Sequence, residues 1–305
     1  MRSSDNGSET TDRDMPAVAN IGERLVQYAL LARMHQPIGS LLLLWPTLWA
    51  LWIAAAGEPD PAVVLVFVAG VFVMRSAGCV MNDFADRRID PHVHRTRNRP
   101  IASGRVSPRE ALVVFAALCL VGLALVLTLN RLALLYSFAA VALAATYPFM
   151  KRWTYLPQVY LGVAFGWGIP MAFAALANEV PLLAWLLLTG VVAWAVAYDT
   201  MYAMVDREDD VRVGVKSSAI LFGDADRFFV GVSQVAVLAV LVLAGRQAGL
   251  GAFYTIATAT GGALFLYQQY LIRNREPAAC FEAFLNNNWV GAIVFAGIVA
   301  DYHWS

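Results

Sequence analysis

Charged residues are scarce in this sequence. Asp, Glu, Lys and Arg make up 14% of the 305 residues, whereas hydrophobic residues make up 59%. Soluble domains contain about 25% charged and about 45–50% apolar residues, so this composition excludes an ordinary soluble domain. It excludes a disordered chain, a collagen-like repeat and a coiled coil as well. The sequence is therefore that of an integral membrane protein.

Cysteine is also rare, and no export or import signal is evident. The three cysteines, Cys79, Cys119 and Cys280, are odd in number and far apart, which excludes a disulfide framework or a zinc cluster. Residues 1–22 are polar and mix acids with few bases, unlike a signal peptide or a transit peptide. We expect residues 1–22 to be a disordered cytoplasmic tail and residues 23–305 to form one transmembrane domain in a bacterial inner membrane.

Long apolar runs fill most of the chain. A helix needs about 20 mostly apolar residues to cross a hydrocarbon core of roughly 30 Å. The runs are continuous rather than alternating, which favours helices over a transmembrane barrel. Nine stretches meet this requirement, at about 39–56, 62–81, 109–128, 132–149, 157–176, 182–204, 228–246, 251–271 and 284–302. The fold class predicted from them is an all-α, nine-helix membrane protein.

Basic residues are distributed unevenly between the two sides of these spans. With nine spans, 19 of the 22 Lys and Arg residues fall on the same side as the N-terminus. The positive-inside rule then places the N-terminus and the long loops in the cytoplasm. The charge pattern indicates a lipid bilayer as the surrounding medium, and it indicates neither a nucleic-acid partner nor an obligatory protein partner.

The first polar cluster follows the second predicted span. Asn82, Asp86 and Asp90 are spaced at i, i+4 and i+8, so they share one face if the helix continues. Carboxylates at this spacing repel one another unless a positive charge lies between them. Magnesium, which prefers one or two carboxylates with phosphate and water, is such a charge. Asp83 lies off this face, and we expect it to be solvated.

The second cluster follows the sixth span. Asp206 and Asp210 are again spaced at i and i+4, and Asp199 lies on the same face deeper in the membrane. Glu208 and Asp209 point elsewhere, and we expect water around them. A solvated acidic loop at the membrane boundary is the alternative for either cluster. Two clusters with the same spacing on the same side favour a shared cation site opening to the cytoplasmic side.

Basic residues surround these acids. Arg75 lies seven residues before Asn82, inside a span, where a charge costs roughly 2.5–3.5 kcal/mol unless it faces a partner or a polar cavity. A structural salt bridge is the alternative for Arg75. The bases of the adjoining loops suit phosphate, although loops on this side are basic for orientation in any case. They are Arg95, Arg97, Arg99, Lys151, Arg152 and Lys216.

Carboxylates for a divalent metal, bases for phosphate and apolar helices around them indicate one type of ligand. A diphosphate head with a long hydrocarbon tail would use all three. Metal and bases would stabilise the negative charge that develops on a departing diphosphate. His92 and His94 stand without further His or Cys nearby, so we interpret them as loop residues rather than ligands of a transition metal.

The two motifs, Asn82-x3-Asp86-x3-Asp90 and Asp206-x3-Asp210, resemble the aspartate-rich motifs of the UbiA superfamily of intramembrane prenyltransferases. The resemblance covers about residues 24–302. Residues 36–39, 147–152 and 199–223 are most similar to the members that prenylate 4-hydroxybenzoate. Two positions differ from that pattern: His35 stands where an acid is common, and Ser218 where Thr is usual. Neither position is a predicted metal ligand.

The resemblance implies nine helices around a central cavity, two Mg²⁺ ions and a polyprenyl diphosphate donor. The implied reaction attaches the prenyl chain ortho to the hydroxyl of 4-hydroxybenzoate, in ubiquinone synthesis. Asp199 is a candidate for deprotonating the phenol. The residues implied to hold the metal are Asn82, Asp86, Asp206 and Asp210, with Asp90 assisting. The residues implied to bind the diphosphate or the acceptor carboxylate are Arg75, Lys151, Arg152 and Lys216.

Two other functions remain open at this stage. A related prenyltransferase could use another aromatic acceptor, such as a naphthoate or homogentisate. A cation-coupled or proton-coupled transporter would also place Asp and Arg inside the membrane. Because nearly all the charges here lie at one side of the membrane, the enzyme is favoured over the transporter.

Overall fold

The computed structural model describes residues 21–93, 96–214 and 216–304, and all regular secondary structure in these ranges is helical. Residues 1–20 of the predicted tail lie outside the described residues, as do His94 and Arg95. The first helix begins at Ile21, so the last two residues of the predicted tail are helical, and the division of the chain at residue 22 stays a prediction.

The helices follow one another with short connections. The α-helices are α1 (Ile21–Leu31), α2 (Ile38–Ala54), α3 (Pro61–Asp86), α4 (Pro108–Val126), α5 (Arg131–Thr146), α6 (Met150–Trp153), α7 (Pro157–Gly166), α8 (Gly168–Ala177), α9 (Leu182–Val213), α10 (Ser218–Phe222), α11 (Asp226–Ala248), α12 (Ala252–Leu271) and α13 (Pro277–Trp304). Single 3₁₀ turns are η1 (Asp90–His92), η2 (Tyr147–Phe149), η3 (Gly223–Ala225) and η4 (Ile272–Asn274).

A helix lies at each of the nine predicted spans, with α7 and α8 together covering one of them. Within the described residues, seven helical stretches are long and apolar enough to cross a membrane: 61–86, 108–126, 131–153, 157–177, 182–212, 218–248 and 277–304. The apolar helix α2 is shorter, and α12 is not among the seven. The structure therefore confirms an all-helical, multi-pass membrane protein, whereas the count of nine spans stays a prediction.

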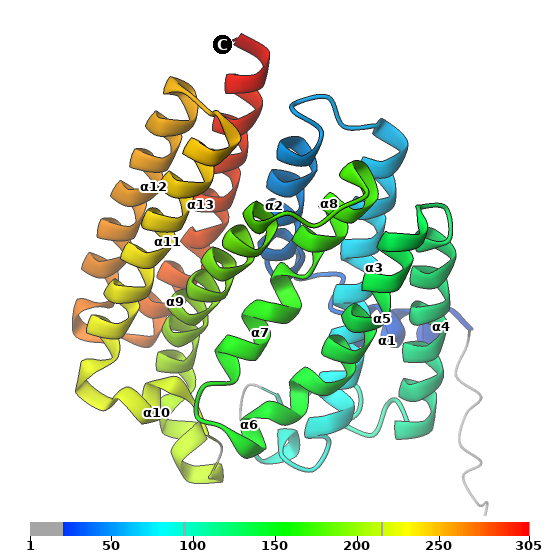
Figure 1. The fold of residues 1–305 in the computed structure, drawn as a ribbon. Coiled ribbons are helices and arrows are strands. Elements are labelled where there is room, and N and C mark those ends of the chain that lie inside the picture. The colour runs from blue at the N-terminus through cyan, green and yellow to red at the C-terminus, as the bar shows by residue number, and fades with distance from the viewer. Residues whose placement is uncertain (1–20, 94–95, 215, 305) are drawn as a thin grey trace, which may run out of the picture.

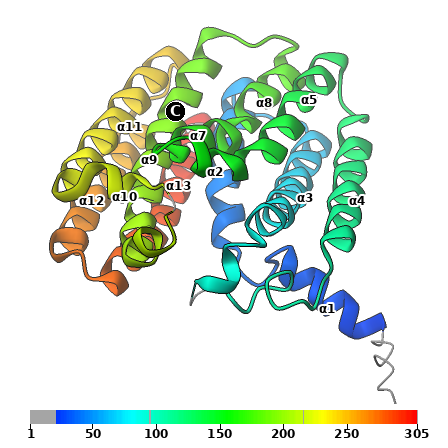
Figure 2. The ribbon, with the colours of Figure 1, turned by 90° about the horizontal axis from the view of Figure 1, so that it is seen from below.

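The long helices run side by side (Figure 1). Helices α4 and α5 lie on one flank and α11 and α12 on the other, with α2, α3, α7 and α9 between them (Figures 1 and 2). The short helices α6 and α10 and the segment after α3 gather at one end, which we call the polar end, and the C-terminus lies at the opposite end. Large apolar side chains on the outer faces of α4, α5, α11 and α12 are exposed, as expected for surfaces that contact lipid.

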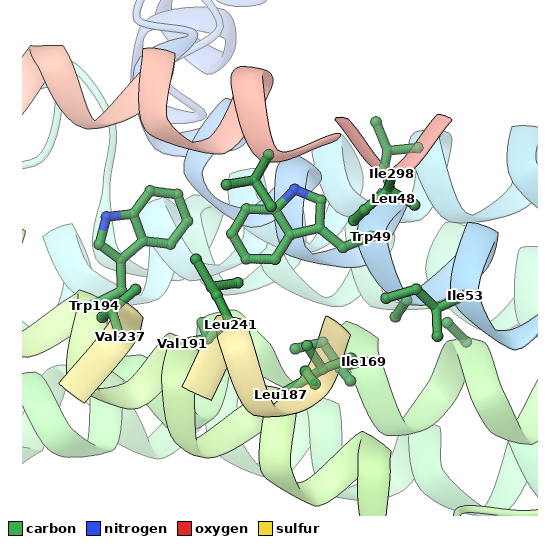
Figure 3. Packing of buried hydrophobic residues seen from close by; sticks show 14 of the residues in the cluster. Leu48, Trp49, Ile53, Ile169, Leu187, Val191, Trp194, Val237, Leu241 and Ile298 are labelled. Carbon is green, nitrogen blue, oxygen red and sulfur yellow. The ribbon is translucent and has the colours of Figure 1, made fainter. Parts of the chain in front are cut away.

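Tryptophans hold the centre of the bundle together (Figure 3). Trp49 of α2 and Trp194 of α9 are stacked with their ring centroids 5.5 Å apart. Both indole N–H groups donate to α13, from Trp49 to the Gly291 carbonyl at 3.0 Å and from Trp194 to Asn287 Oδ1 at 2.8 Å. Polar groups inside a membrane protein need internal partners, because lipid offers none. These bonds therefore fix α2 and α9 against α13.

Two helices extend to the polar end and carry the acidic clusters there. Helix α3 begins at Pro61, where the Asp60 side chain accepts a hydrogen bond from the Ala62 N–H, and it continues to Asp86. Helix α9 has 32 residues, a length of about 48 Å. This is longer than a hydrocarbon core of roughly 30 Å requires. The last turns of α9, with Asp206 and Asp210, therefore extend to the polar end.

Candidate active site

One cavity of about 970 Å³ contains nearly all of the predicted site residues. Its wall includes residues of α2, α3, α7, α9 and α13 and of the loops at the polar end. Nine of the ten predicted site residues line it: Asn82, Asp86, Asp90, Arg75, Lys151, Asp199, Asp206, Asp210 and Lys216. The acidic residues of α3 and α9 thus share one cavity, although more than 100 residues separate them along the chain.

Bases, rather than water alone, face the carboxylates of the first cluster. The Lys151 ammonium forms an ion pair with the Asp86 carboxylate. Arg99 Nη1 lies 2.9 Å from Asp90 Oδ2 and 3.1 Å from Oδ1. Asp86 and Asp90 are 2% and 4% exposed, so little water competes with the two bases for their carboxylates. The repulsion expected from the i, i+4 spacing is therefore offset by Lys151 and Arg99 in this structure.

Asp83 differs from the expectation that it is solvated, and that expectation is wrong. It is 1% exposed, with Arg33 Nη2 at 2.6 Å and Arg99 Nη1 at 3.3 Å from its Oδ1. The segment after α1 packs over this face of α3, which the spacing of α3 alone cannot reveal. Burial lowers the pKa of Arg33, but the Asp83 carboxylate outweighs it, so the pKa is raised and the guanidinium stays charged.

The second cluster faces the cavity along one side of α9. Asp199, Asp206 and Asp210 all line it. Glu208 and Asp209 lie off this face, as expected: the Glu208 side chain is 92% exposed, and both carboxylates lie near Arg212 at the surface. Asp199, Asp206 and Asp210, at i, i+7 and i+11, therefore mark the cavity side of α9, and Glu208 and Asp209 mark its solvent side.

The predicted bases fall into two groups. Lys151, Lys216 and Arg75 line the cavity, whereas Arg152 does not. Arg152 donates to the Ala85 carbonyl at 2.6 Å and its guanidinium lies 5.2 Å from the Phe149 ring, which ties α6 to the end of α3. The role of Arg152 in substrate binding stays a prediction that the cavity geometry does not support.

Arg75 lies inside the bundle, and within the described residues its guanidinium makes a single hydrogen bond. Its Nη1 donates to Cys79 Sγ at 2.8 Å, and the guanidinium lies 5.6 Å from the Phe165 ring centroid. Across the described ranges, no carboxylate forms an ion pair with Arg75, so the alternative of a structural salt bridge finds no support. The guanidinium also lies where a side chain at Gly39 would be, since a Cβ there would come within 2.5 Å of Nη2. The absence of that Cβ makes room for Arg75 beside α2.

Buried polar atoms without partners mark the cavity wall. Four such atoms belong to residues that line it: Asp86 Oδ1, Gln158 Oε1, Tyr198 OH and Ser217 Oγ. Buried polar atoms in native proteins are nearly always hydrogen-bonded, so clustered exceptions indicate a missing ligand or water. Of these residues the sequence pointed only to Asp86. Gln158, Tyr198 and Ser217 are ordinary helix or loop residues until the fold brings them to one cavity.

A divalent metal fits these groups in chemistry. Within the described part of the chain, no three His, Cys, Asp or Glu side chains stand close enough to form a ready-made metal site. Magnesium, however, takes one or two carboxylates and completes its octahedron with phosphate and water. The Asp86 carboxylate keeps one buried oxygen without a hydrogen-bond partner in the described structure. An oxygen ligand for a hard cation is thus present.

Comparison with known proteins establishes the family. Residues 43–296 match the model of the UbiA prenyltransferase family, so the chain belongs to this family. It is 60% identical, over 92% of its length and 96% of the relative, to a 4-hydroxybenzoate octaprenyltransferase of Alkalilimnicola ehrlichii. It is also 60% identical to the enzyme of that name from Nitrosococcus oceani, over 92% of this chain and 98% of the relative.

Solved structures have the same fold. The apo structure of a UbiA homolog from Aeropyrum pernix K1 is 29% identical and superposes with a TM-score of 0.76, over 86% of this chain and 97% of the other. A UbiA homolog from Archaeoglobus fulgidus bound to GPP and Mg²⁺ is 18% identical, with a TM-score of 0.69 over 89% and 99% of the two chains. At that identity, the second comparison supports the fold alone.

Proposed function

We propose that this protein transfers a polyprenyl group from polyprenyl diphosphate to the ring carbon ortho to the hydroxyl of 4-hydroxybenzoate, in ubiquinone synthesis. The C–O bond to the diphosphate breaks, a C–C bond to the ring forms, and the ring proton and diphosphate leave. The single observation that carries the proposal is one cavity with acids from α3 and α9 facing Lys151 and Lys216. Relatives 60% identical that are named for this reaction support it.

The metal site of the proposal uses the aspartate-rich motifs. Asn82, Asp86, Asp206 and Asp210 would hold Mg²⁺, with Asp90 assisting, and the orphaned Asp86 Oδ1 supports this assignment. The Archaeoglobus fulgidus homolog bound to GPP and Mg²⁺ supports a divalent ion in this fold. When bound, the ion supplies positive charge that stabilises the departing diphosphate.

The lysines contribute to the same stabilisation. Lys151 and Lys216 line the cavity from α6 and from the loop before α10. A Lys side chain carries a compact charge on a flexible stem and can reorient from a carboxylate to a phosphate. In our proposal, Lys151 leaves Asp86 when the diphosphate arrives and donates to a phosphate oxygen, so that Asp86 becomes available to the cation.

Arg75 is the group we assign to the acceptor carboxylate. It lies seven residues, or about two helical turns, below Asn82 on α3, and it lines the cavity, where its Nη1 donates to Cys79 Sγ. A guanidinium binds a carboxylate through two parallel hydrogen bonds, which orients the ring as well as holding it. Asp199, also at the cavity wall, is the candidate that removes the phenolic proton. Prenylation would take place between these groups and the metal end.

The test is a reconstituted reaction. Purified protein in detergent receives Mg²⁺, geranyl diphosphate and either 4-hydroxybenzoate, 1,4-dihydroxy-2-naphthoate or homogentisate, and product is identified by mass spectrometry. The proposal expects 3-geranyl-4-hydroxybenzoate as the main product, and no product in excess chelator. Preference for the naphthoate or homogentisate would contradict the acceptor assignment, and full turnover in chelator would contradict the metal assignment. The placement in a bacterial inner membrane with a cytoplasmic N-terminus is tested separately by cysteine labelling at loop positions.

A further inference from the structure

The four orphaned buried atoms of the cavity divide into two sets. Asp86 Oδ1 and Ser217 Oγ belong to residues next to Lys151 and Lys216, among the groups already assigned to the metal and the diphosphate. Gln158 Oε1 and Tyr198 OH belong to residues that have no part in that assignment. Each of these two residues is only 2% exposed, and each lines the cavity.

Both side chains are held in place by their surroundings. Gln158 lies in the first turn of α7, which packs so closely on α9 that a Cβ at Gly162 would come within 2.6 Å of the Val192 backbone. The Tyr198 ring is held edge-on by Trp194 and Phe284, with centroids 5.8 and 6.1 Å away. The Tyr198 ring is thus held by its neighbours, and the backbone that carries Gln158 is fixed against α9.

The two groups lie beside Asp199. Tyr198 is its neighbour in α9, and Gln158 lines the same cavity. Within the described residues, the carbonyl oxygen Oε1 of Gln158 has no hydrogen-bond partner. The cavity wall therefore contains two residues with buried, unpartnered polar atoms: Gln158, whose Oε1 can accept a hydrogen bond, and Tyr198, whose hydroxyl can donate or accept one.

Only some ligand groups can form hydrogen bonds with both of these atoms. A carboxylate or a diphosphate oxygen has no proton for Gln158 Oε1, and a prenyl chain would leave both atoms unpaired at a cost of about 1–3 kcal/mol each. A ligand O–H group has both capacities, because it can donate to an acceptor such as Gln158 Oε1 and accept from a donor such as Tyr198 OH. A neutral phenol hydroxyl is such a group, and the proposed acceptor has one.

We propose that Gln158 and Tyr198 form a subsite for the phenol hydroxyl of the aromatic acceptor and thereby determine that phenols are chosen over ring compounds without a hydroxyl. This inference rests on the proposed function, because it takes an aromatic phenol as the acceptor. Held at its hydroxyl by this pair, the ring has its ortho carbons next to the held group.

The test is a comparison of equilibrium binding rather than of turnover. Binding of 4-hydroxybenzoate and of benzoate, which differ only by the hydroxyl, is measured by isothermal titration calorimetry on purified protein without a prenyl donor. Wild type, Gln158→Leu and Tyr198→Phe are compared. Gln27→Leu is the matched control, because Gln27 Oε1 is also a buried orphan but belongs to α1 and does not line the cavity.

The expected result is a loss of discrimination. Wild type and the Gln27 variant should bind 4-hydroxybenzoate more tightly than benzoate by about three- to tenfold or more, from the net value of a neutral hydrogen bond. In the Gln158 and Tyr198 variants that ratio should fall towards one while benzoate binds as before. An unchanged ratio of the two affinities in both variants would overturn the inference. Gln158 Oε1 and Tyr198 OH would then be assigned to bound water. Tyr198→Phe removes one oxygen only, so it tests the inference even if Gln158→Leu does not fold.

Failure of the proposed function would look different. If wild type prenylates a different phenolic acceptor, the same binding comparison is made with that acceptor and with its analogue that lacks the hydroxyl. Loss of hydroxyl discrimination in the variants then supports the subsite, and its persistence overturns the subsite, whichever acceptor the reaction assay selects.

Discussion

The Lys151 ammonium lies directly against the Asp86 carboxylate, so a base proposed for the diphosphate and an acid proposed for the metal neutralise each other in this structure. Lys151 comes from α6 and Asp86 from the end of α3, 65 residues apart. The pair keeps a buried carboxylate from standing as an uncompensated charge. Binding of a metal and a diphosphate would separate the two groups and give each a new partner.

Replacement of Lys151 should therefore impair turnover more than replacement of its neighbour. We expect Lys151→Met to lower kcat/KM by about 100-fold or more, the usual effect of removing one group that stabilises developing charge. Arg152→Met should lower it by less than tenfold, because Arg152 contacts Ala85 and Phe149 rather than the cavity. Steady-state assays in membranes containing equal amounts of each variant give the comparison. An equal loss of kcat/KM in the two variants would contradict the conclusion that the substrate contacts Lys151 and not Arg152.

The aspartates that line the cavity should be essential, whereas an acid on the solvent side of the same helix should not. Asp86→Ala and Asp210→Ala should abolish prenyl transfer while the protein still inserts into the membrane, because each removes a proposed metal ligand. Glu208→Ala is the matched control, since its side chain is 92% exposed and two residues from Asp210. Near-normal rates in either aspartate variant would end the metal assignment.

Arg75 should determine selectivity for the acceptor's carboxylate. Hydrogen bonds to charged groups contribute about 1.5–3 kcal/mol, or roughly 10- to 100-fold. We expect Arg75→Met to raise KM for 4-hydroxybenzoate by that factor, while the activity on methyl 4-hydroxybenzoate changes little. The assay compares the acid and the ester in wild type and variant. If the variant loses both acceptors equally and instead raises KM for the prenyl diphosphate, Arg75 binds the donor.

A second ion-pair cluster predicts an effect on stability rather than on chemistry. Asp226, at the start of α11, is fully buried, with Arg275 Nη2 at 2.8 Å and Arg207 Nη1 at 3.8 Å. The hydrogen bond to Asp226 raises the pKa of Arg275, so the guanidinium stays charged. Asp226→Ala should destabilise the fold by roughly 3–5 kcal/mol, because two partly buried arginines lose their partner.

The change should be visible as a lower melting temperature in detergent, measured by scanning fluorimetry. Asp224→Ala, two residues earlier and exposed, provides the control and should melt like wild type. Because Arg207 adjoins Asp206 in α9, the same cluster holds the end of α9 that carries the second aspartate motif. Equal melting temperatures for the two variants would mean that the arginines find other partners.

The sequence predicted the parts of the site that depend on a single helix. Asp199, Asp206 and Asp210 share one side of α9, as their spacing requires, and Glu208 lies on the other side. Asp83 shows the limit of this reasoning. Spacing places it off the shared face of α3, but only packing decides that the segment after α1 covers that face and brings Arg33 to it.

The residues that sequence reasoning missed have a common physical explanation. Gln158, Tyr198 and Ser217 are polar residues of kinds that occur in any loop or helix end, and nothing in their spacing distinguishes them. What distinguishes them is that each has a buried polar atom without a hydrogen-bond partner in the described structure. Burial is a property of how α7 packs on α9 and how both face α3, and these contacts join residues dozens of positions apart.

The sequence by itself determined that this chain crosses a membrane as helices, because long apolar runs can be buried in lipid only when each helix satisfies its own backbone hydrogen bonds. It also determined which acids share a helix face, because 3.6 residues per turn fixes their direction along one axis. Only the tertiary structure decided which bases meet those acids and which uncharged groups complete the cavity. Helix period says nothing of the angle and depth at which one helix packs against the next.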